Sequence, residues 1–102
     1  MPFEPPLPVL IDPEALNEGR EAIAWYEERN PRAAERFQIE LEHVIERITK
    51  MPHSFPETEQ GVRRASLSRF PYSVLFAVEG ESLIILAIAH NRRQVGYWHD
   101  RR

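Results

Sequence analysis

Apolar residues recur at three- and four-residue steps from Pro13 to about Glu28, which is the period of an amphipathic helix. Asp12 followed by Pro13 is a typical helix start, with Asp12 as the N-cap. The residues expected to face the core are Ala15, Leu16, Gly19, Ala22, Ile23 and Tyr26. The acidic residues expected on the outer face are Glu14, Glu18, Glu21, Glu27 and Glu28.

A second helix is predicted to begin at Asn30-Pro31 and to end before Pro52. Its apolar stripe consists of Ala34, Phe37, Leu41, Val44 and Ile48, widened by Ile45. Glu46 and Lys50 stand four residues apart, in the order that favours an ion pair. Because the link between the two helices is so short, we expect them to pack as an antiparallel hairpin.

The period of the pattern changes after the second helix. Residues 53–61 are expected to form a loop, and residues 62–68, 72–78 and 82–89 alternate or run apolar as strands do. Glycine within residues 79–81 indicates a hairpin turn, and short links favour an antiparallel meander. The predicted fold class is α+β: an N-terminal strand at residues 9–11, an antiparallel helical hairpin that covers the sheet, and a three-stranded antiparallel meander.

Length and composition are those of one globular domain. The chain has 102 residues, of which 42% are hydrophobic and 28% are charged. Four of its nine prolines lie within the first eight residues, where they disfavour both helix and sheet. We therefore predict a proline-rich, extended segment at residues 1–8 and a single domain at residues 9–102.

Several classes of protein are disfavoured by what the sequence lacks. It has no cysteine, which excludes disulfides, zinc fingers, iron–sulfur clusters and thiol nucleophiles. The four histidines match no metal motif, and we expect neither a metal site nor a cofactor. No apolar run reaches the roughly 18–20 residues of a membrane span, and the N-terminus does not resemble a secretory signal. We therefore expect a cytoplasmic protein with no membrane partner.

Charge is distributed unevenly along the chain. Residues 1–46 carry 11 acidic side chains and four arginines, a balance of −7, whereas residues 47–102 have a balance of +4. Of the 13 basic residues, 12 are arginine, which suits planar contacts with carboxylates or phosphates. A GC-rich genome accounts for the same bias equally well.

A polar, aromatic and cationic tail follows the last predicted strand. On an antiparallel sheet, its arginines and those of the first meander strand are expected to converge on one outward surface. This candidate target-binding surface consists of Arg63, Arg64, Arg69, Arg92, Arg93, Tyr97, Trp98 and Arg101. The alternative is that Trp98 packs against the sheet edge while the arginines of the tail pair with glutamates of the helices.

Two further positions have alternative interpretations. His90 ends the last strand, where a histidine either serves as a general base or phosphate contact or orders a turn through the backbone. In the first helix, Tyr26 is in phase with the apolar stripe and Trp25 is partly out of phase. Trp25 therefore either marks a partner surface or covers the edge of the sheet.

One ordered set of segments runs through residues 9–101. It comprises Ala22-Ile23-Ala24-Trp25-Tyr26-Glu27-Glu28-Arg29-Asn30-Pro31, Ala34, Arg36-Phe37, Ile48, Met51-Pro52, Val62-Arg63-Arg64, Arg69-Phe70-Pro71-Tyr72, His90-Asn91-Arg92-Arg93 and Tyr97-Trp98. This set resembles the RelE/ParE superfamily of bacterial type II toxins, nearer to the ParE-like, plasmid stabilisation branch. The fold of that superfamily has the same order of elements that the periodicity predicts.

The resemblance implies a toxin that a cognate antitoxin, ParD-like or similar, binds and neutralises. Candidate antitoxin-binding residues are then Trp25, Tyr26 and Phe37. ParE-like members inhibit DNA gyrase without catalytic residues, whereas RelE-like members cut messenger RNA on the ribosome. A ribonuclease of this kind would be metal-independent, and its catalytic candidates here are Arg64, His90 and Arg93.

Charge favours one of these activities over the other. The sequence pI is near 5.8 and the chain has a single lysine, whereas affinity for RNA grows with positive charge. We therefore expect a protein-binding inhibitor of gyrase rather than an enzyme. The alternatives are a ribosome-dependent endoribonuclease and a non-toxic interaction module.

Overall fold

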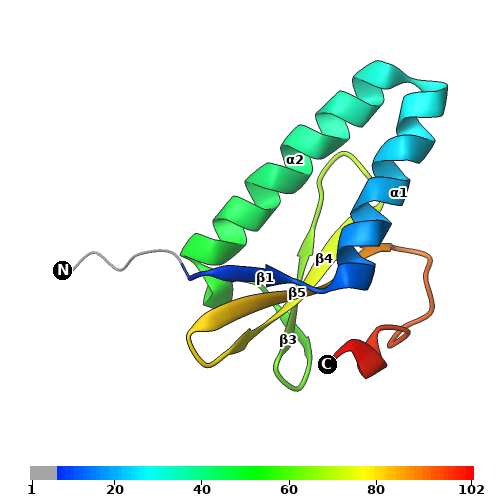
Figure 1. Cartoon of the computed structure of the whole chain (residues 1–102). Coiled ribbons are helices and arrows are strands. Elements are labelled where there is room, and N and C mark those ends of the chain that lie inside the picture. Colours follow the sequence, from blue (N-terminus) through cyan, green and yellow to red (C-terminus); the bar gives the residue numbers. More distant parts are fainter. Residues whose placement is uncertain (1–6) are drawn as a thin grey trace.

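The computed structural model describes residues 7–102, which form a five-stranded sheet with two helices on one face (Figure 1). The elements are β1 (Val9–Ile11), α1 (Pro13–Arg29), α2 (Pro31–Lys50), β2 (Glu57–Glu59), β3 (Val62–Ser66), β4 (Tyr72–Glu79) and β5 (Ser82–His90). The strand order is β1-β5-β4-β3-β2, with β1 parallel to β5 and the other pairs antiparallel. The predicted α+β class is confirmed. Residues 1–6 of the predicted proline-rich segment lie outside the described residues.

Both helices begin where the sequence predicts, because each has an N-cap residue whose side-chain oxygen accepts backbone hydrogen bonds and which is followed by proline. The Asp12 carboxylate accepts hydrogen bonds from the backbone N–H groups of Glu14 and Ala15, at 2.9 and 3.4 Å. Asn30 caps α2 in the same way, and its own N–H donates to the Tyr26 carbonyl at the end of α1. One residue thus ends the first helix and starts the second, and the two helices run antiparallel as a hairpin (Figure 1).

The predicted meander is present, with one strand more than expected. β4 and β5 pair along their whole length and are joined by Gly80-Glu81, where Gly80 takes φ +61°. The predicted loop at residues 53–61 is wrong in part, because residues 57–59 pair with β3 as the edge strand β2. Within residues 7–102, no helix is long and apolar enough to cross a membrane.

The sheet is covered on both faces. The larger core lies between the sheet and the helical hairpin, and its fully buried side chains include Phe37, Ile48, Val74, Phe76, Leu83 and Ile85. Gly19 lets α1 approach β5 closely, since a Cβ there would lie 3.1 Å from the Ile88 side chain. A second core on the opposite face consists of Val62, Ala77, Leu86, Ala87, Ala89 and Trp98. The helical hairpin is therefore not the only cover of the sheet.

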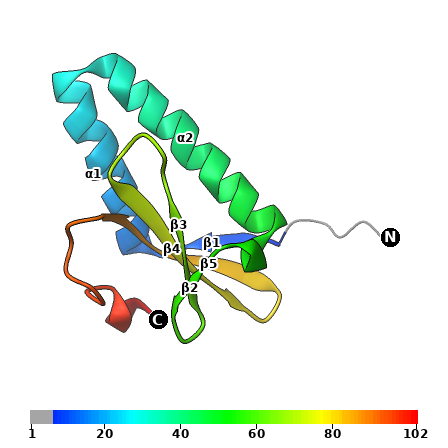
Figure 2. The same cartoon turned by 180° about the vertical axis from the view of Figure 1, so that it is seen from behind.

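The C-terminal tail, residues 91–102, provides the cover of the second face. It passes the N-terminal end of α1 and ends beside the turn between β2 and β3 (Figures 1 and 2). Arg102 donates to the Gln60 carbonyl at 2.6 Å, and His99 pairs with Glu59 at 2.9 Å. The end of the tail is thus fixed at the edge of the sheet, beside the turn between β2 and β3.

The loop between β3 and β4 is fixed by Glu40 of α2. The Glu40 carboxylate accepts hydrogen bonds from the backbone N–H and hydroxyl of Ser68 and from the backbone N–H of Arg69. Desolvation by the loop raises the pKa of Glu40, but these hydrogen bonds and the charge of Arg69 outweigh it and hold the pKa below its ordinary value. The ionised form of Glu40 is therefore the one that stabilises the loop.

This arrangement predicts a pH dependence of stability. Because the folded pKa of Glu40 is lowered, its contribution is complete above the unfolded pKa of about 4.3 and is lost as pH falls through the folded value. Urea unfolding between pH 7 and 3 should show the wild type more stable than Glu40→Gln at neutral pH, with a difference that narrows toward acid. Glu35→Gln on the same helix is the matched control. A difference that stays constant with pH would contradict the assignment.

Candidate functional site

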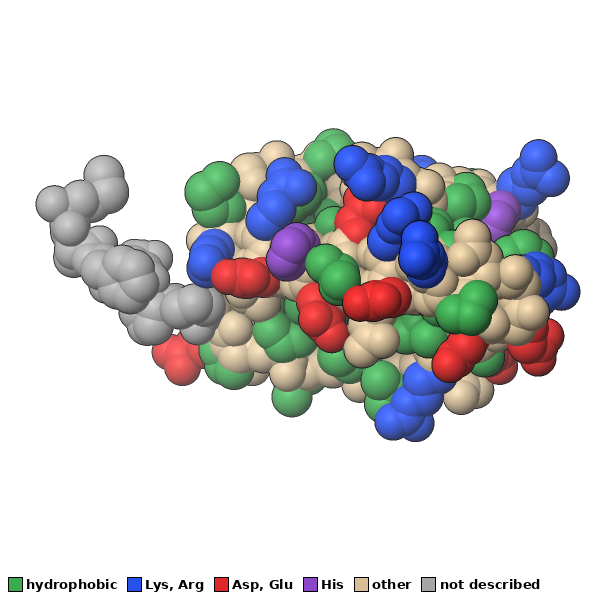
Figure 3. Space-filling view, turned by 90° about the horizontal axis from the view of Figure 1, so that it is seen from above, with side chains coloured by type: hydrophobic (Ala, Val, Ile, Leu, Met, Phe, Trp, Pro, Cys, Tyr) green, Lys and Arg blue, Asp and Glu red, His purple; other side chains and the backbone are tan. Residues whose placement is uncertain are grey.

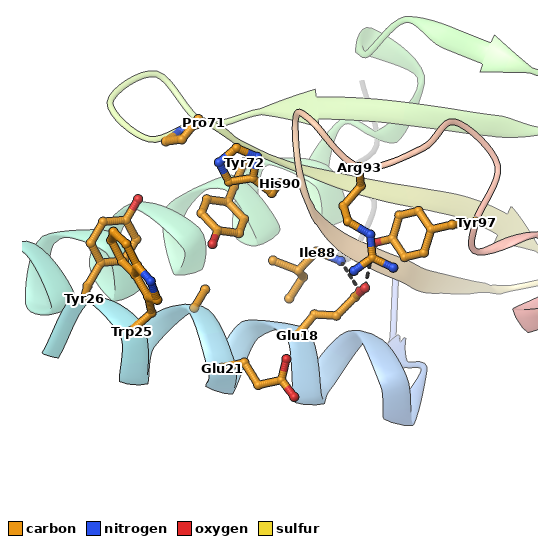
Figure 4. A pocket seen from close by; sticks show the side chains of 11 residues that line it. Glu18, Glu21, Trp25, Tyr26, Pro71, Tyr72, Ile88, His90, Arg93 and Tyr97 are labelled. Atoms are coloured by element: carbon orange, nitrogen blue, oxygen red, sulfur yellow. Dashed lines mark hydrogen bonds between the residues drawn. The ribbon is translucent and has the colours of Figure 1, made fainter. Parts of the chain in front are cut away.

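Two hollows lie on either side of the sheet near the end of β5. The larger, which we call the aromatic groove, has a volume of about 490 Å³ and lies between α1 and the sheet (Figure 4). Its lining residues are Glu18, Glu21, Ala22, Trp25, Tyr26, Pro71, Tyr72, Ile88, His90, Arg93 and Tyr97. The smaller, the tail hollow, has a volume of about 130 Å³ and lies under the C-terminal tail.

The walls of the aromatic groove are rings packed edge to face. Trp25 and Tyr26 stand at one end, Arg93 and Tyr97 at the other, and Tyr72 between them (Figure 4). The Trp25 and Tyr26 rings are 5.1 Å apart, and the Tyr26 ring lies 6.4 Å from that of Tyr72. Trp25 remains 50% exposed although it belongs to this ring cluster. An exposed indole in a preformed hollow is typical of a site that receives side chains of a partner.

Glu18 forms the far end of the groove and holds three elements together. Its carboxylate accepts from the backbone N–H of Ile88 at 3.1 Å and from the Tyr97 hydroxyl at 2.6 Å (Figure 4). Arg101 donates to the same carboxylate at 2.8 and 3.2 Å, and also to Glu14 at 2.7 Å. Glu18 therefore connects α1, β5 and the tail.

This network fixes the protonation of its members. Desolvation raises the pKa of Tyr97, and the hydrogen bond to Glu18 raises it further, so the hydroxyl stays protonated and donates. Although burial lowers the pKa of Arg101, the bonds to Glu18 and Glu14 outweigh this effect, and the pKa lies above its ordinary value. The Arg93 guanidinium lies over the Tyr97 ring, 3.9 Å from its centroid.

The tail hollow has a polar wall built around Arg64. The Arg64 guanidinium donates to the Ser73 hydroxyl and to the Asn91 side-chain oxygen, both at 3.0 Å, and Ser73 donates to Asn91 at 2.7 Å. His90 and Arg93 line this hollow as well. The Nδ1 atom of His90 accepts the backbone N–H of Arg92 at 3.1 Å, so His90 orders the turn after β5. Among residues 7–102, no group of three or more acidic or histidine side chains is placed to hold a metal ion.

Comparison with known proteins gives the family. The family model for the ParE toxin of the type II toxin–antitoxin system parDE matches residues 9–95. The chain belongs to the ParE toxin family. A solved structure of the chromosomal ParDE toxin–antitoxin system from P. aeruginosa has a similar fold, with TM-score 0.73 and 20% identity over 82% of this chain and 95% of that one. No curated protein matches the sequence.

Of the three candidate antitoxin-binding residues in this ParE family member, two line the groove and one does not. Trp25 and Tyr26 both line it, and the exposure expected for Trp25 is observed. Phe37 is a wrong assignment, because its ring is completely buried between α2 and the sheet, in contact with Tyr26, Phe70 and Tyr72. It supports the groove from behind and offers no surface to a partner.

The structure divides the predicted arginine surface. Arg64 and Arg93 line the tail hollow with Tyr97, and exposed Arg92 follows in the adjoining turn. Three others do not join them. Arg63 points to the helix side and donates to the Phe55 carbonyl, Arg69 lies beside α2, and Arg101 is buried against Glu14 and Glu18. The expectation of one convergent surface is therefore wrong for these three, because neighbouring strand residues face opposite sides of a sheet and the tail folds back.

Trp98 requires the clearest correction. Its side chain is 3% exposed and belongs to the second core, so the expectation of an outward indole is wrong, although Trp98 lines the tail hollow together with Arg64 and Arg93. The alternative interpretation holds for Trp98, which packs on the sheet, and for Arg101, which pairs with glutamates of α1. An indole needs a large apolar contact area, and the open face of β4 and β5 provides it.

Glu18 lines the groove and bonds to the tail, and sequence reasoning missed it. We expected it on the outer face of α1, but its side chain faces the sheet and is only 14% exposed. Its position was a usable signal, because it stands three residues after the buried Ala15 and four before the buried Ala22. A carboxylate within an apolar stripe needs buried donors, and Tyr97 and Arg101 supply them.

Replacing Glu18 with glutamine should loosen the tail. The change removes the charge that Arg101 and Tyr97 share, and we expect a loss of about 2–3 kcal/mol in the free energy of unfolding. Hydrogen exchange of residues 97–102 should become faster. Glu21→Gln, one turn along the same helix at the groove rim, is the matched control. Equal protection of the tail in Glu18→Gln and wild type would contradict this role for Glu18.

Proposed function

We propose that the chain is the toxin of a type II pair that acts in the cytoplasm by binding DNA gyrase, and that a ParD-like antitoxin neutralises it. The family match over residues 9–95 carries this proposal. Two features support a protein-binding mode of action. The net charge is −3, which disfavours ribosomal RNA as a target, and the lining of the aromatic groove includes the rings of Trp25, Tyr26, Tyr72 and Tyr97.

The aromatic groove is the proposed antitoxin site. A volume of about 490 Å³ accommodates two bulky apolar side chains from one face of an amphipathic helix. Trp25 provides an exposed ring at one end, and Glu21 and Arg93 supply opposite charges on the rim for polar contacts. The apolar floor thus gives affinity and the rim gives orientation.

A ribosome-dependent endoribonuclease is the second candidate, because Arg64, His90 and Arg93 line the same tail hollow. Cleavage through the 2′-hydroxyl needs a base, an acid and a cation at one phosphate. Here the Arg64 guanidinium already donates to Ser73 and Asn91, and His90 Nδ1 already accepts a backbone N–H. These internal bonds would have to break for the three side chains to serve one phosphate, so we favour the gyrase inhibitor.

Induced expression in a bacterial host distinguishes the candidates. We expect growth arrest with a DNA-damage response and intact transcripts, and relief of the arrest by co-expression of the cognate antitoxin. Transcripts cut on the ribosome, with cleavage lost in Arg64→Ala, would replace the proposal with the ribonuclease. If expression of the chain without the antitoxin does not slow growth, the remaining interpretation is a non-toxic interaction module.

A further inference from the structure

One face of α2 carries a row of basic side chains. They recur at steps of three, four and seven residues and, at 3.6 residues per turn, fall within one narrow stripe of the helix. The row consists of Arg32, Arg36, His43, Arg47 and Lys50, and Arg69 of the neighbouring loop lies beside it. We call these six residues the basic ridge. Figure 3 shows Lys, Arg and His side chains in a row across this face.

The charges of the ridge are largely uncompensated. Within residues 7–102, no carboxylate lies within ion-pair distance of Arg32, Arg36, Arg47 or Arg69, and only Lys50 has such a partner, Glu46. Glu40 lies at the edge of the ridge, where it accepts hydrogen bonds from the β3–β4 loop and interacts with the charge of Arg69, so Arg69 is partly compensated. The guanidinium groups of Arg32, Arg36 and Arg47 that remain without a carboxylate, on a chain of net charge −3, favour an acidic ligand.

An apolar position interrupts the ridge at its centre. The apolar side chains on the other face of α2 are buried in the core, whereas Ile39 lies on the solvent side and is 47% exposed. It lines a shallow hollow of about 260 Å³ together with Arg36, Glu40, His43, Ser68, Arg69 and Phe70. An exposed isoleucine beside a hollow gives an apolar anchor point among the charges.

We propose that the basic ridge binds an acidic, amphipathic helix of a second protein partner, with one apolar side chain of that helix seated against Ile39. The ridge extends over 19 residues of α2, which is about 27 Å, and a helix lying along it would bring carboxylates at i, i+4 spacing opposite the arginines. The exposed Ile39 would then be covered, and the unpaired cations would gain partners.

Nucleic acid fits this face less well. A row of acidic residues, Glu35, Glu42 and Glu46, runs along the same helix directly beside the ridge. Figure 3 shows acidic side chains alongside the basic row. A duplex is wide enough to bring its phosphates close to both rows, and the acidic row would repel them. Ile39 at the centre would also contribute nothing to phosphate binding.

The ridge is separate from the proposed antitoxin site. No residue lines both the aromatic groove and the hollow beside Ile39. The Tyr26 ring lines the groove, the Phe70 ring lines the hollow, and these two rings pack 5.2 Å apart, so the two sites are adjacent but built from different residues. The inference does not depend on the proposed function.

The test uses a fluorescent helical peptide of about 18 residues, with glutamate at i, i+4 positions beside a leucine stripe. Fluorescence anisotropy against the full chain should give saturable, salt-sensitive binding.

Arg36→Glu should weaken binding of the peptide by about tenfold, and the milder Arg36→Gln by less. Ile39→Ala should also weaken binding without changing the salt dependence. Arg20→Glu, an exposed arginine of α1 with the same change in net charge, is the control and should stay within about twofold of wild type.

Several results would overturn the inference. One is that the peptide does not bind to the chain. Another is that Arg36→Glu and Arg20→Glu weaken peptide binding equally. A third is that a DNA or RNA duplex binds to the ridge more tightly than the peptide does. Self-association of the chain that Arg36→Glu abolishes would assign the ridge to a second copy instead. Trp25→Ala should leave peptide binding unchanged, which separates this test from that of the antitoxin site.

Discussion

Replacing Trp98 with alanine is expected to lower the free energy of unfolding by about 3–5 kcal/mol. Trp98 is 3% exposed and is the largest side chain of the second core, where it covers Val62, Ala87 and Ala89. Small residues of the sheet cannot move to fill the space, so the cavity would remain. Urea unfolding monitored by circular dichroism measures the loss directly.

The other tryptophan provides the control for this change. Trp25→Ala also removes an indole, but from a side chain that is 50% exposed, and it should cost about 1 kcal/mol or less. If Trp98→Ala proves too unstable to purify, Trp98→Phe should fold with a smaller loss. Equal losses for the two alanine variants would contradict the existence of a second core built on the tail.

Trp25→Ala is expected to weaken antitoxin binding by about 2–4 kcal/mol, or roughly 30- to 1,000-fold in Kd. The reason is that Trp25 is the exposed aromatic ring of a preformed groove, supported by Tyr26 at 5.1 Å. Isothermal titration with the cognate antitoxin gives the Kd. The fold should stay intact, because the indole contributes little to the core.

Leu16→Ala is the matched control for the groove. Leu16 is a half-exposed apolar residue of the same helix that does not line the groove. Its removal should change the Kd by less than about twofold. Loss of affinity in Leu16→Ala with unchanged affinity in Trp25→Ala would place the antitoxin at the exposed start of α1 instead.

The elements that the sequence predicts well are those specified by local rules. The two helices begin at Asp12-Pro13 and Asn30-Pro31 because a side-chain cap and a proline act within three residues of each other. The meander follows from alternating residues and the glycine turn at Gly80. The edge strand β2 was missed because three residues are too few to establish a period.

The tail could not be predicted because its structure depends on distant contacts. Tyr97 bonds to Glu18 across 79 positions of sequence, and Arg101 bonds to Glu14 across 87. No periodicity within residues 91–102 indicates that Trp98 turns inward, since that depends on the second sheet face being otherwise uncovered. The opposite orientations of Arg63 and Arg64, in contrast, follow from strand alternation alone.

Supercoiling by purified DNA gyrase tests the central claim most directly. We expect the purified chain to inhibit supercoiling at near-stoichiometric amounts and an excess of the antitoxin to restore activity. The Trp25→Ala variant should inhibit gyrase but resist this rescue. Undiminished supercoiling at a large molar excess of folded protein, together with cleavage of messenger RNA on purified ribosomes, would contradict the account.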